Sequence, residues 1–195
     1  MPPPKSFRAL IGLPPSTATP TNSALILIDA QTEYASGLLA TTNVAATRAA
    51  IKSLLHKYRA AGGDVVHVLH RTPEGAPVFT DGGTEAEMEE LRGVEGEAAE
   101  KTIHKTMPSS FAGTDLHEYL EKTGKKKVVL TGYMAHVCVS TTARQAAELG
   151  YDVILAEDAI GDRDIPGMSG EEVTRAALLE LGDAFGTVVN SSEIK

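Results

Sequence analysis

Short runs of apolar, mostly β-branched residues recur along this chain, and they constrain its fold more than any other feature. The run SALILID at 23–29 is apolar until it ends in a carboxylate, and DVVHVLH at 64–70 is a second such run. Runs of this kind suit strands that are buried on both faces of a parallel sheet. The same pattern predicts strands at the start of 128–150, within 151–161 and at 185–190, and a short edge strand at 102–105.

Helical patterns with recognisable ends separate these runs. Asn43 is a candidate N-cap for the helix VAATRAAIKSLLHKYRAAGG, and Ser169 is a candidate N-cap for SGEEVTRAALLELGD. Further helices are expected in EAEMEELRG at 85–93, from Thr114 to Gly124, and from Cys138 to Gly150. Strands that alternate with helices predict a three-layer α/β/α fold around a mostly parallel, doubly wound (Rossmann-like) sheet of about six strands.

The chain divides into an arm and one domain. Residues 1–22 are rich in Pro, Ser and Thr, so we expect an extended arm that either is disordered or lies across a neighbouring subunit. Residues 23–195 contain no internal repeat and form one predicted domain, long enough to bury a sizeable core. The polar connection from Arg71 to Glu100 is long for a compact domain, which is typical of a functional loop.

Charge and composition exclude several classes of partner. The net charge is −8, and both a nucleic acid and an anionic membrane need a basic face, so neither is expected. The Lys125 to Lys127 run is interpreted as a solvated stretch before a strand. No apolar run approaches the roughly 20 residues that cross a bilayer. The single cysteine cannot form an internal disulfide, and prolines break the N-terminal apolar patch, so we expect a cytoplasmic protein with a free thiol.

The stretch VVLTGYMAHVCVSTTARQAAELG at 128–150 combines a strand, a tight turn and the only cysteine at the start of a helix. A helix N-terminus offers free N–H groups and a positive dipole end, which favour a thiolate and an oxyanion. Cys138 is therefore the candidate nucleophile of a hydrolase. Asp29 and Lys105 also follow predicted strands, and ligands of open α/β sheets bind at the carboxyl ends of the strands.

These segments resemble the isochorismatase-like cysteine hydrolases, a family that includes nicotinamidases and N-carbamoylsarcosine amidase. The resemblance lies in LIDAQ at 27–31, KTMPSSFAGTDL at 105–116, GYMAHVCVSTTARQAAELGYDV at 132–153 and AEDAIGDRD at 156–164, and covers nearly the whole chain after the arm. It implies an isochorismatase-like hydrolase domain at 23–195. It also implies a catalytic triad of Asp29, Lys105 and Cys138.

The resemblance assigns a role to each residue of this triad. Asp29 takes the thiol proton as a base and returns it as an acid, and Lys105 supplies electrostatic support to both partners. The backbone N–H groups of Met134 and Cys138 form the implied oxyanion hole, with a cis peptide between Tyr133 and Met134. Candidate substrate contacts are Gln31, Tyr34, Phe111 and Tyr133, on segments expected to surround the pocket.

The chain departs from the family pattern at two places. Ala135 stands where many relatives have Thr. The segment HRTPEGAPVF at 70–79 lacks the Asp-x-His spacing of the nicotinamidase metal site, so we expect no metal and no cofactor. His67 and His70 are three residues apart on a strand and therefore face opposite sides, which makes a poor metal pair. The expected partners are a small-molecule substrate and further copies of the chain, as a homodimer or homotetramer.

Three functions remain open at this point. The favoured one is hydrolysis of a small amide through a thioester on Cys138. The second is isochorismatase activity, in which a vinyl ether is cleaved by protonation to release pyruvate and a dihydroxybenzoate precursor; the third is a non-catalytic binding protein of the same fold. A dyad of Cys138 with His136 is not favoured, because two residues across a tight turn need not share a pocket.

Overall fold

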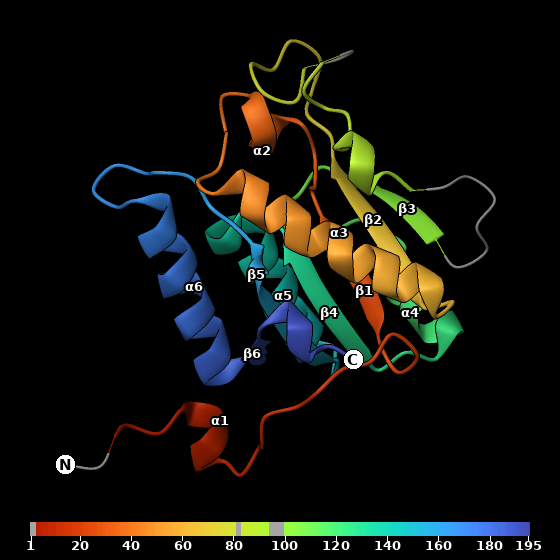
Figure 1. Ribbon diagram of the computed structural model, residues 1–195, viewed down its shortest axis with the longest axis vertical. Helices are drawn as coiled ribbons and strands as arrows, with labels where there is room; N and C mark the ends of the chain where they lie inside the picture. Colours follow the sequence, from red (N-terminus) through yellow and green to blue (C-terminus); the bar gives the residue numbers. More distant parts are fainter. Residues whose placement is uncertain (1–2, 81–82, 94–99) are drawn as a thin grey trace.

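The computed structural model describes residues 3–80, 83–93 and 100–195, and its centre is a parallel sheet (Figure 1). The strands are β1 (Ala24–Ile28), β2 (Asp64–His70), β3 (Glu100–Lys105), β4 (Lys127–Gly132), β5 (Asp152–Ile160) and β6 (Thr187–Val189). Their order is β3-β2-β1-β4-β5-β6, and every neighbouring pair is parallel. This is the doubly wound order, with its reversal between β1 and β4. The predicted fold is confirmed.

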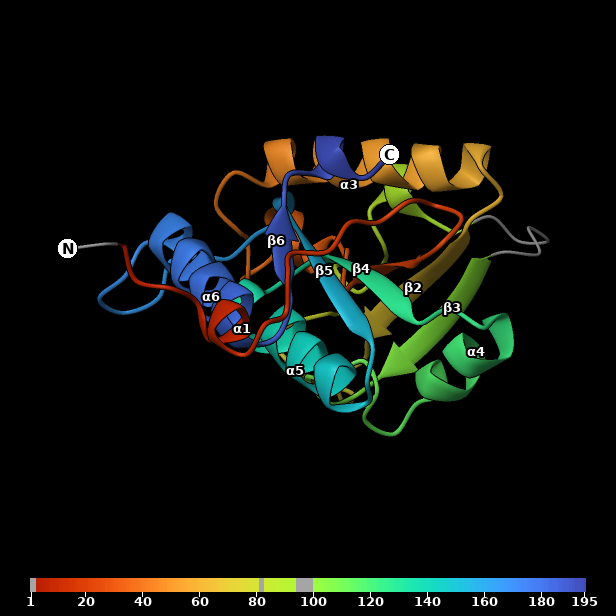
Figure 2. The ribbon, with the colours of Figure 1, turned by 90° about the horizontal axis from the view of Figure 1, so that it is seen from below.

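Helices cover both faces of the sheet and complete three layers (Figure 2). They are α1 (Phe7–Leu10), α2 (Glu33–Ser36), α3 (Val44–Ala60), α4 (Leu116–Thr123), α5 (Ser140–Glu148) and α6 (Gly170–Ala184), together with the 3₁₀ turns η1 (Glu89–Leu91) and η3 (Ser191–Glu193) and the π-helical turn η2 (Ala135–Val139). Helix α3 lies over one face, whereas α4, α5 and α6 lie on the other.

The alternation of side chains along each strand explains why the apolar runs are continuous. In β1, Leu25 and Leu27 belong to the core under α3, whereas Ile26 and Ile28 belong to the core under α4, α5 and α6. Successive side chains of a strand point to opposite faces, so a strand covered on both faces needs an apolar residue at every position. All five residues of β1 are buried.

The helix ends agree only in part with the sequence predictions. Ser169 caps α6 as expected, and its side chain and that of Glu172 form a reciprocal capping box. Asn43 does precede α3, but it adopts a left-handed conformation (φ 56°) and its side chain donates to Glu171 instead of capping the helix. Asn43 is thus the N-cap residue of α3 by position, and its carbonyl accepts the N–H of Thr47, but its side chain makes no capping hydrogen bond.

Two further elements are shorter than expected. In the helix predicted at 85–93, only the 3₁₀ turn η1 forms. The predicted helix from Thr114 begins at Leu116 and ends at Gly124, which takes the left-handed conformation typical of a helix end. The edge strand predicted at 102–105 is β3, and it does lie at one edge of the sheet.

The N-terminal arm is fixed to the body at several points, and one helical turn, α1, interrupts it. The Phe7 N–H donates to Asp183 of α6, the Ser16 N–H donates to Thr187, and Lys127 contacts Ser16 and the carbonyl of Thr17. Phe7 and other apolar residues of this segment remain exposed (Leu10, Ile11 and Leu13). Among the described residues, no helix is both long and apolar enough to span a membrane.

Candidate active site

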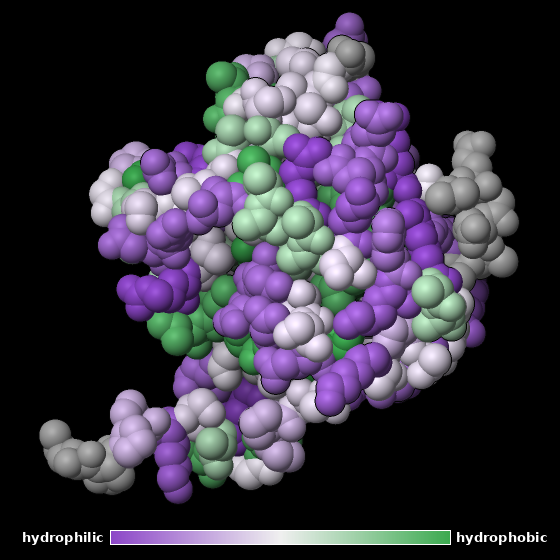
Figure 3. All heavy atoms as spheres, in the orientation of Figure 1, coloured by the Kyte–Doolittle hydropathy of each residue, from purple (hydrophilic) through white to green (hydrophobic). Residues whose placement is uncertain are grey.

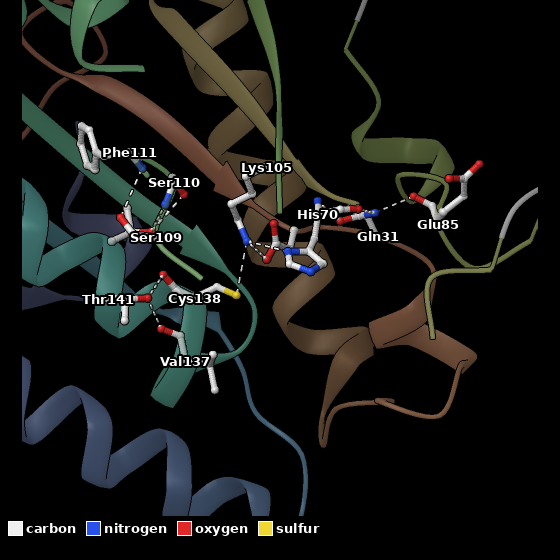
Figure 4. Close-up of polar contacts among 12 residues, drawn as sticks. Gln31, His70, Glu85, Lys105, Ser109, Ser110, Phe111, Val137, Cys138 and Thr141 are labelled. Carbon is white, nitrogen blue, oxygen red and sulfur yellow. Dashed lines mark hydrogen bonds and ion pairs between the residues drawn. The ribbon is translucent and has the colours of Figure 1, made fainter. Parts of the chain in front are cut away.

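The carboxyl ends of three strands and one turn bring the predicted catalytic residues together (Figure 4). Asp29 follows β1, Lys105 ends β3, and Cys138 lies in the π-helical turn η2 after β4. The Lys105 Nζ atom lies 2.7 Å from Asp29 Oδ2 and 3.4 Å from Cys138 Sγ. Thus one ammonium group contacts both a carboxylate and a thiol, although the three residues are far apart in the sequence.

Burial makes these contacts strong. The side chains of Asp29 and Lys105 are fully buried, and Cys138 is only 5% exposed. Water screens a buried pair much less than an exposed one. Removing one partner leaves a buried charge without its counterion, which is strongly destabilising.

The backbone of Asp29 is held in an unusual conformation, with φ at 50°. Its N–H donates to the carbonyl of Val68 on β2, and its carbonyl accepts from the N–H of Gln31. A non-glycine residue with positive φ persists only where its surroundings impose it. The Oδ1 atom of Asp29 is buried and makes no hydrogen bond with the described residues, so it is the carboxylate oxygen left to receive a proton.

The acid–base state of the cluster differs from what the helix N-terminus suggested. Burial raises the pKa of the Cys138 thiol to about 12, and the negative charge of Asp29 raises it further than Lys105 lowers it. Burial also raises the pKa of Asp29, against the opposing effect of Lys105. The positive end of the helix is therefore not the dominant influence on the thiol, because Cys138 lies before the start of α5 and beside a carboxylate. A thiol with a raised pKa needs a base before it can act as a nucleophile, and Asp29 is the predicted base.

The turn after β4 carries the two backbone groups expected to form an oxyanion hole. The peptide bond between Tyr133 and Met134 is cis. The Ala135 N–H donates to the carbonyl of Gly161, and the Met134 carbonyl accepts from the N–H groups of Val137 and Val139. These bonds fix the turn around Met134 and Cys138. Their role as oxyanion donors stays a prediction.

The four predicted substrate contacts have different surroundings. Tyr34 is buried beside the cluster, where burial and then the charges of Asp29 and Cys138 raise its pKa. The Tyr133 hydroxyl contacts Thr47 at 2.7 Å. The Phe111 ring stacks on Tyr151, with centroids 5.9 Å apart, in the core under α4 to α6.

Gln31 does not have the arrangement expected of a substrate contact. It is fully buried, and its amide oxygen accepts from the N–H of His70 at 2.7 Å while its amide nitrogen donates to the carbonyls of His70 and Glu85. These three bonds occupy the amide within the protein. Gln31 therefore holds the end of β2 against the loop that contains Glu85, and its role as a substrate contact stays a prediction.

His70 is a site residue that the sequence prediction missed. Its Nδ1 atom lies 3.2 Å from Lys105 Nζ, and the two residues are paired in the register of β2 and β3. His67, as expected, faces the other way and contacts Glu87. The missed signal was the position of His70 as the last residue of the apolar run at 64–70, just as Asp29 is the last residue of the run at 23–29.

His136 makes its own pair away from the thiol. Its Nδ1 atom lies 2.6 Å from Asp162 Oδ2, and the same oxygen accepts the His136 backbone N–H at 3.0 Å. These contacts orient the imidazole toward the loop after β5. Within the described part of the chain, no group of three or more His, Cys, Asp or Glu side chains is arranged to hold a metal ion.

The buried carboxylate of Glu33 ties together the two loops beside the cluster. It accepts the backbone N–H groups of Leu39 and Phe79, both at 3.0 Å, and the hydroxyl of Thr84. Burial alone would raise its pKa, but these hydrogen bonds outweigh burial and lower the pKa. The loops at 30–42 and 71–80 thus depend on one ionised side chain.

A cavity of about 820 Å³ lies elsewhere, between α3, α6 and the N-terminal arm. Its lining includes Thr42, Glu171, Arg175, Leu178 and Leu179. Figure 3 shows hydrophobic residues at the bottom of the hollow between α6 and α3. Neither the thiol nor its two charged neighbours lines this cavity, so we do not assign the chemistry to it.

Comparisons with known proteins agree with this geometry. The model of the Isochorismatase domain family matches residues 23–193. The chain is 57% identical, over 97% of its length and 98% of the relative's, to the "Secreted isochorismatase effector Isc1" of Verticillium dahliae. A crystal structure of an isochorismatase from Pseudomonas putida superposes with a TM-score of 0.92 at 32% identity, covering 99% of this chain and 100% of that one. An N-carbamoylsarcosine amidase from Thermoplasma acidophilum gives 0.75 at 27% identity, covering 90% and 99%.

Proposed function

This chain belongs to the isochorismatase family of hydrolases, and from that premise we propose that it cleaves a carbon–nitrogen bond of a small amide through a thioester on Cys138. One observation carries the proposal: the Lys105 ammonium group contacts Asp29 and Cys138 together in a nearly closed site. A base, a cation and a nucleophile within hydrogen-bond reach are the parts that covalent acyl transfer needs.

In the first half of the reaction, the Cys138 sulfur attacks the carbonyl carbon while its proton passes to Asp29. The carbonyl electrons move to the oxygen, which the backbone N–H groups of Met134 and Cys138 stabilise. The raised pKa of Asp29 suits this exchange, because a carboxyl group whose pKa is closer to neutrality both accepts and returns a proton more readily. Collapse then breaks the C–N bond, and Asp29 gives its proton to the departing amine.

In the second half, Asp29 takes a proton from water as the water oxygen attacks the thioester. The C–S bond breaks, the carboxylic acid is released, and the sulfur recovers the proton from Asp29. Lys105 stays charged throughout and stabilises the negative charge on whichever partner holds it. The cycle consumes one water and returns every group to its starting state.

A Cys138→Ala protein provides the first test. We expect it to fold and to release no detectable ammonia or amine from a panel of small amides. Mass spectrometry of quenched wild-type protein should show an acyl adduct on Cys138. A variant that turns over at the wild-type rate contradicts the covalent scheme.

A second candidate is isochorismatase activity, which the name of the Verticillium dahliae relative favours. That reaction cleaves a vinyl ether after protonation and needs an acid but no nucleophile. The two candidates therefore differ in one variant: Asp29→Asn abolishes both activities, whereas Cys138→Ala abolishes only the amidase. Pyruvate release from isochorismate that survives in Cys138→Ala supports the second candidate, and the first is removed if the wild type also releases no ammonia or amine from the amide panel.

A further inference from the structure

The proposed reaction uses two of the three contacts that Lys105 makes, and the third is with His70. The Nζ atom lies 2.7 Å from Asp29 Oδ2, 3.2 Å from His70 Nδ1 and 3.4 Å from Cys138 Sγ. An ammonium group has three hydrogens to donate and cannot accept. Three acceptors thus match three hydrogens, and each contact limits where the other two hydrogens point.

The same count defines the state of His70. Because the ammonium group can only donate, Nδ1 must be an acceptor, so the imidazole is neutral and carries its hydrogen on Nε2. Burial, and then the charge of Lys105, lower the pKa of His70 to about 4, which agrees with this state. The imidazole therefore stays an acceptor through the neutral pH range.

Contacts from the loops at 30–42 and 71–80 hold His70 in place. Gln31 bonds both the N–H and the carbonyl of His70 (Figure 4). The ring of Phe79 packs against the imidazole, with centroids 5.1 Å apart. Glu33 in turn fixes the Phe79 backbone. Such support is what a side chain needs if its position is to control a neighbour.

We propose that His70 is a positioning residue of the active site: it accepts one hydrogen of the Lys105 ammonium group and thereby directs another toward the Cys138 sulfur. This inference rests on the proposed role of Lys105 beside Cys138. Without His70, the ammonium group can turn about its Cε–Nζ bond and direct its hydrogens to Asp29 alone. The sulfur then loses a donor that stabilises the negative charge developing on it.

Alkylation of Cys138 by iodoacetamide tests the inference without knowledge of the substrate, because the chain contains a single cysteine. The rate is measured from about pH 6 to about pH 10, below the raised pKa of the thiol, where the rate at each pH follows the fraction of thiolate. The titratable groups that face this site are Asp29 after β1, Tyr34 on α2, Lys105 on β3 and Cys138 on η2, with the Arg71–Glu85 pair beyond His70.

The variants distinguish the effect of the hydrogen-bond acceptor at His70 from the effect of its side-chain volume. His70→Asn places an oxygen near the Nδ1 position, His70→Leu has a similar volume with no acceptor, and His56→Leu changes an exposed histidine on α3 as a control. We expect His70→Leu to slow alkylation about tenfold at a given pH and to move the profile to higher pH, the effect of one charged hydrogen bond. His70→Asn should recover all but about threefold of the rate, and His56→Leu should match the wild type.

The other possible results of the alkylation experiment decide against the inference or against the role proposed for Lys105. If His70→Leu does not fold, His70→Gln replaces it, since its longer amide places the acceptor beyond Nδ1 and should slow alkylation in the same way. Equal alkylation rates for His70→Asn and for His70→Leu, or for its replacement His70→Gln, overturn the inference. A pH profile for His70→Leu that matches the wild type overturns it as well. Lys105→Met distinguishes a failure of the His70 inference from a failure of the role proposed for Lys105. If Lys105→Met moves the pH profile and His70→Leu does not, only the His70 inference fails. If Lys105→Met leaves the profile unchanged, the role proposed for Lys105 fails as well.

Discussion

At the scale of single residues, the acid–base state of the site depends on charges that lie side by side. The Cys138 thiol is a weaker acid than an ordinary cysteine for two reasons, its burial and the negative charge of Asp29. Burial depends on the whole fold, but the charge of Asp29 is removed by a single substitution. The cysteine of Asp29→Asn should therefore ionise at lower pH than that of the wild type, although this variant loses the proposed base.

The prediction is measured by the ¹³Cβ chemical shift of the single cysteine during a pH titration. We expect no thiolate in the wild type at neutral pH and a lower apparent pKa in Asp29→Asn. Asp115→Asn, at an exposed carboxylate beside α4, is the matched control and should leave the titration unchanged. A thiol that is already ionised at pH 7 in the wild type contradicts the protonated resting state.

His70 also makes stability depend on pH. Its pKa in the folded protein, about 4, lies below the ordinary value of 6.5, so the unfolded chain binds the proton first as the pH falls. The stability that His70 contributes is complete above about pH 6.5 and is lost between there and about pH 4. Urea unfolding should show a steeper loss in this window for the wild type than for His70→Asn, and equal slopes would contradict the low pKa.

At the scale of elements, the close approach of β1 and β4 depends on Gly132. Its φ is 104°, and a Cβ atom there would lie 1.9 Å from the carbonyl oxygen of Ile28. Gly132→Ala should lower the free energy of unfolding by about 4 kcal/mol or more, because backbone rather than a flexible side chain must move. Gly150→Ala is the control: its φ is 85°, but the space around it is open, so we expect about 1 kcal/mol.

Urea denaturation measures the free energy of unfolding of both variants. Similar losses of stability in Gly132→Ala and Gly150→Ala would contradict a special role for the contact between β1 and β4 at Gly132. The loss in Gly132→Ala should be accompanied by slower Cys138 alkylation. The reason is that the same strand end leads into the turn that carries Met134 and the cysteine.

The loops beside the site form a second element-level test through Glu33. Glu33→Gln keeps the size of the side chain but weakens its bonds to the two backbone N–H groups and to Thr84, so stability at pH 7 should fall by about 1–3 kcal/mol. The pKa of Glu33 is lowered in the fold, so its contribution is present above the ordinary value of 4.5 and is lost as the pH falls through the lowered one.

Urea unfolding across the acid range should therefore show the wild type and Glu33→Gln converging at low pH. Hydrogen exchange should become faster at Leu39 and Phe79 in the variant at neutral pH. Glu118→Gln, on the exposed side of α4, is the control. A gap between wild type and Glu33→Gln that does not depend on pH would contradict an ionised Glu33.

At the scale of the whole molecule, the N-terminal arm has an exposed part and an anchored part. Deleting residues 1–13 removes a segment whose described side chains are mostly exposed, and should change the free energy of unfolding by no more than about 1 kcal/mol. Deleting residues 1–19 also removes the contacts of Ser16 and the buried Ala18, and should cost clearly more. Equal losses from the two deletions would contradict this division.

Assembly and location stay predictions for this chain. A homodimer or homotetramer is expected, and sedimentation velocity of the full chain and of the shorter deletion would show whether the exposed apolar residues of the arm take part in it. The cytoplasmic location also stays a prediction, and one relative carries the word "secreted" in its name.

The sequence by itself determined the order of the strands and the main helices along the chain, although it did not predict α1 or α2. Apolar runs gave β1 and β2 to within a residue, the Ser169 pattern predicted the start of α6, and motifs marked Asp29, Lys105 and Cys138. Each of these depends on neighbours in the chain: strand burial on side-chain alternation, capping on groups a few residues apart.

Only the tertiary structure decided the hydrogen-bond partners, the burial and the pKa values of those residues. The Asn43 side chain donates to Glu171, the Gln31 amide bonds the His70 backbone, and the His70 imidazole contacts Lys105 on the neighbouring strand. The state of Cys138 likewise follows from burial and from a carboxylate more than a hundred residues away in the sequence. Desolvation and charge act through distance in space, which local sequence does not contain, so the sequence marked the candidate nucleophile but not the pKa of its thiol.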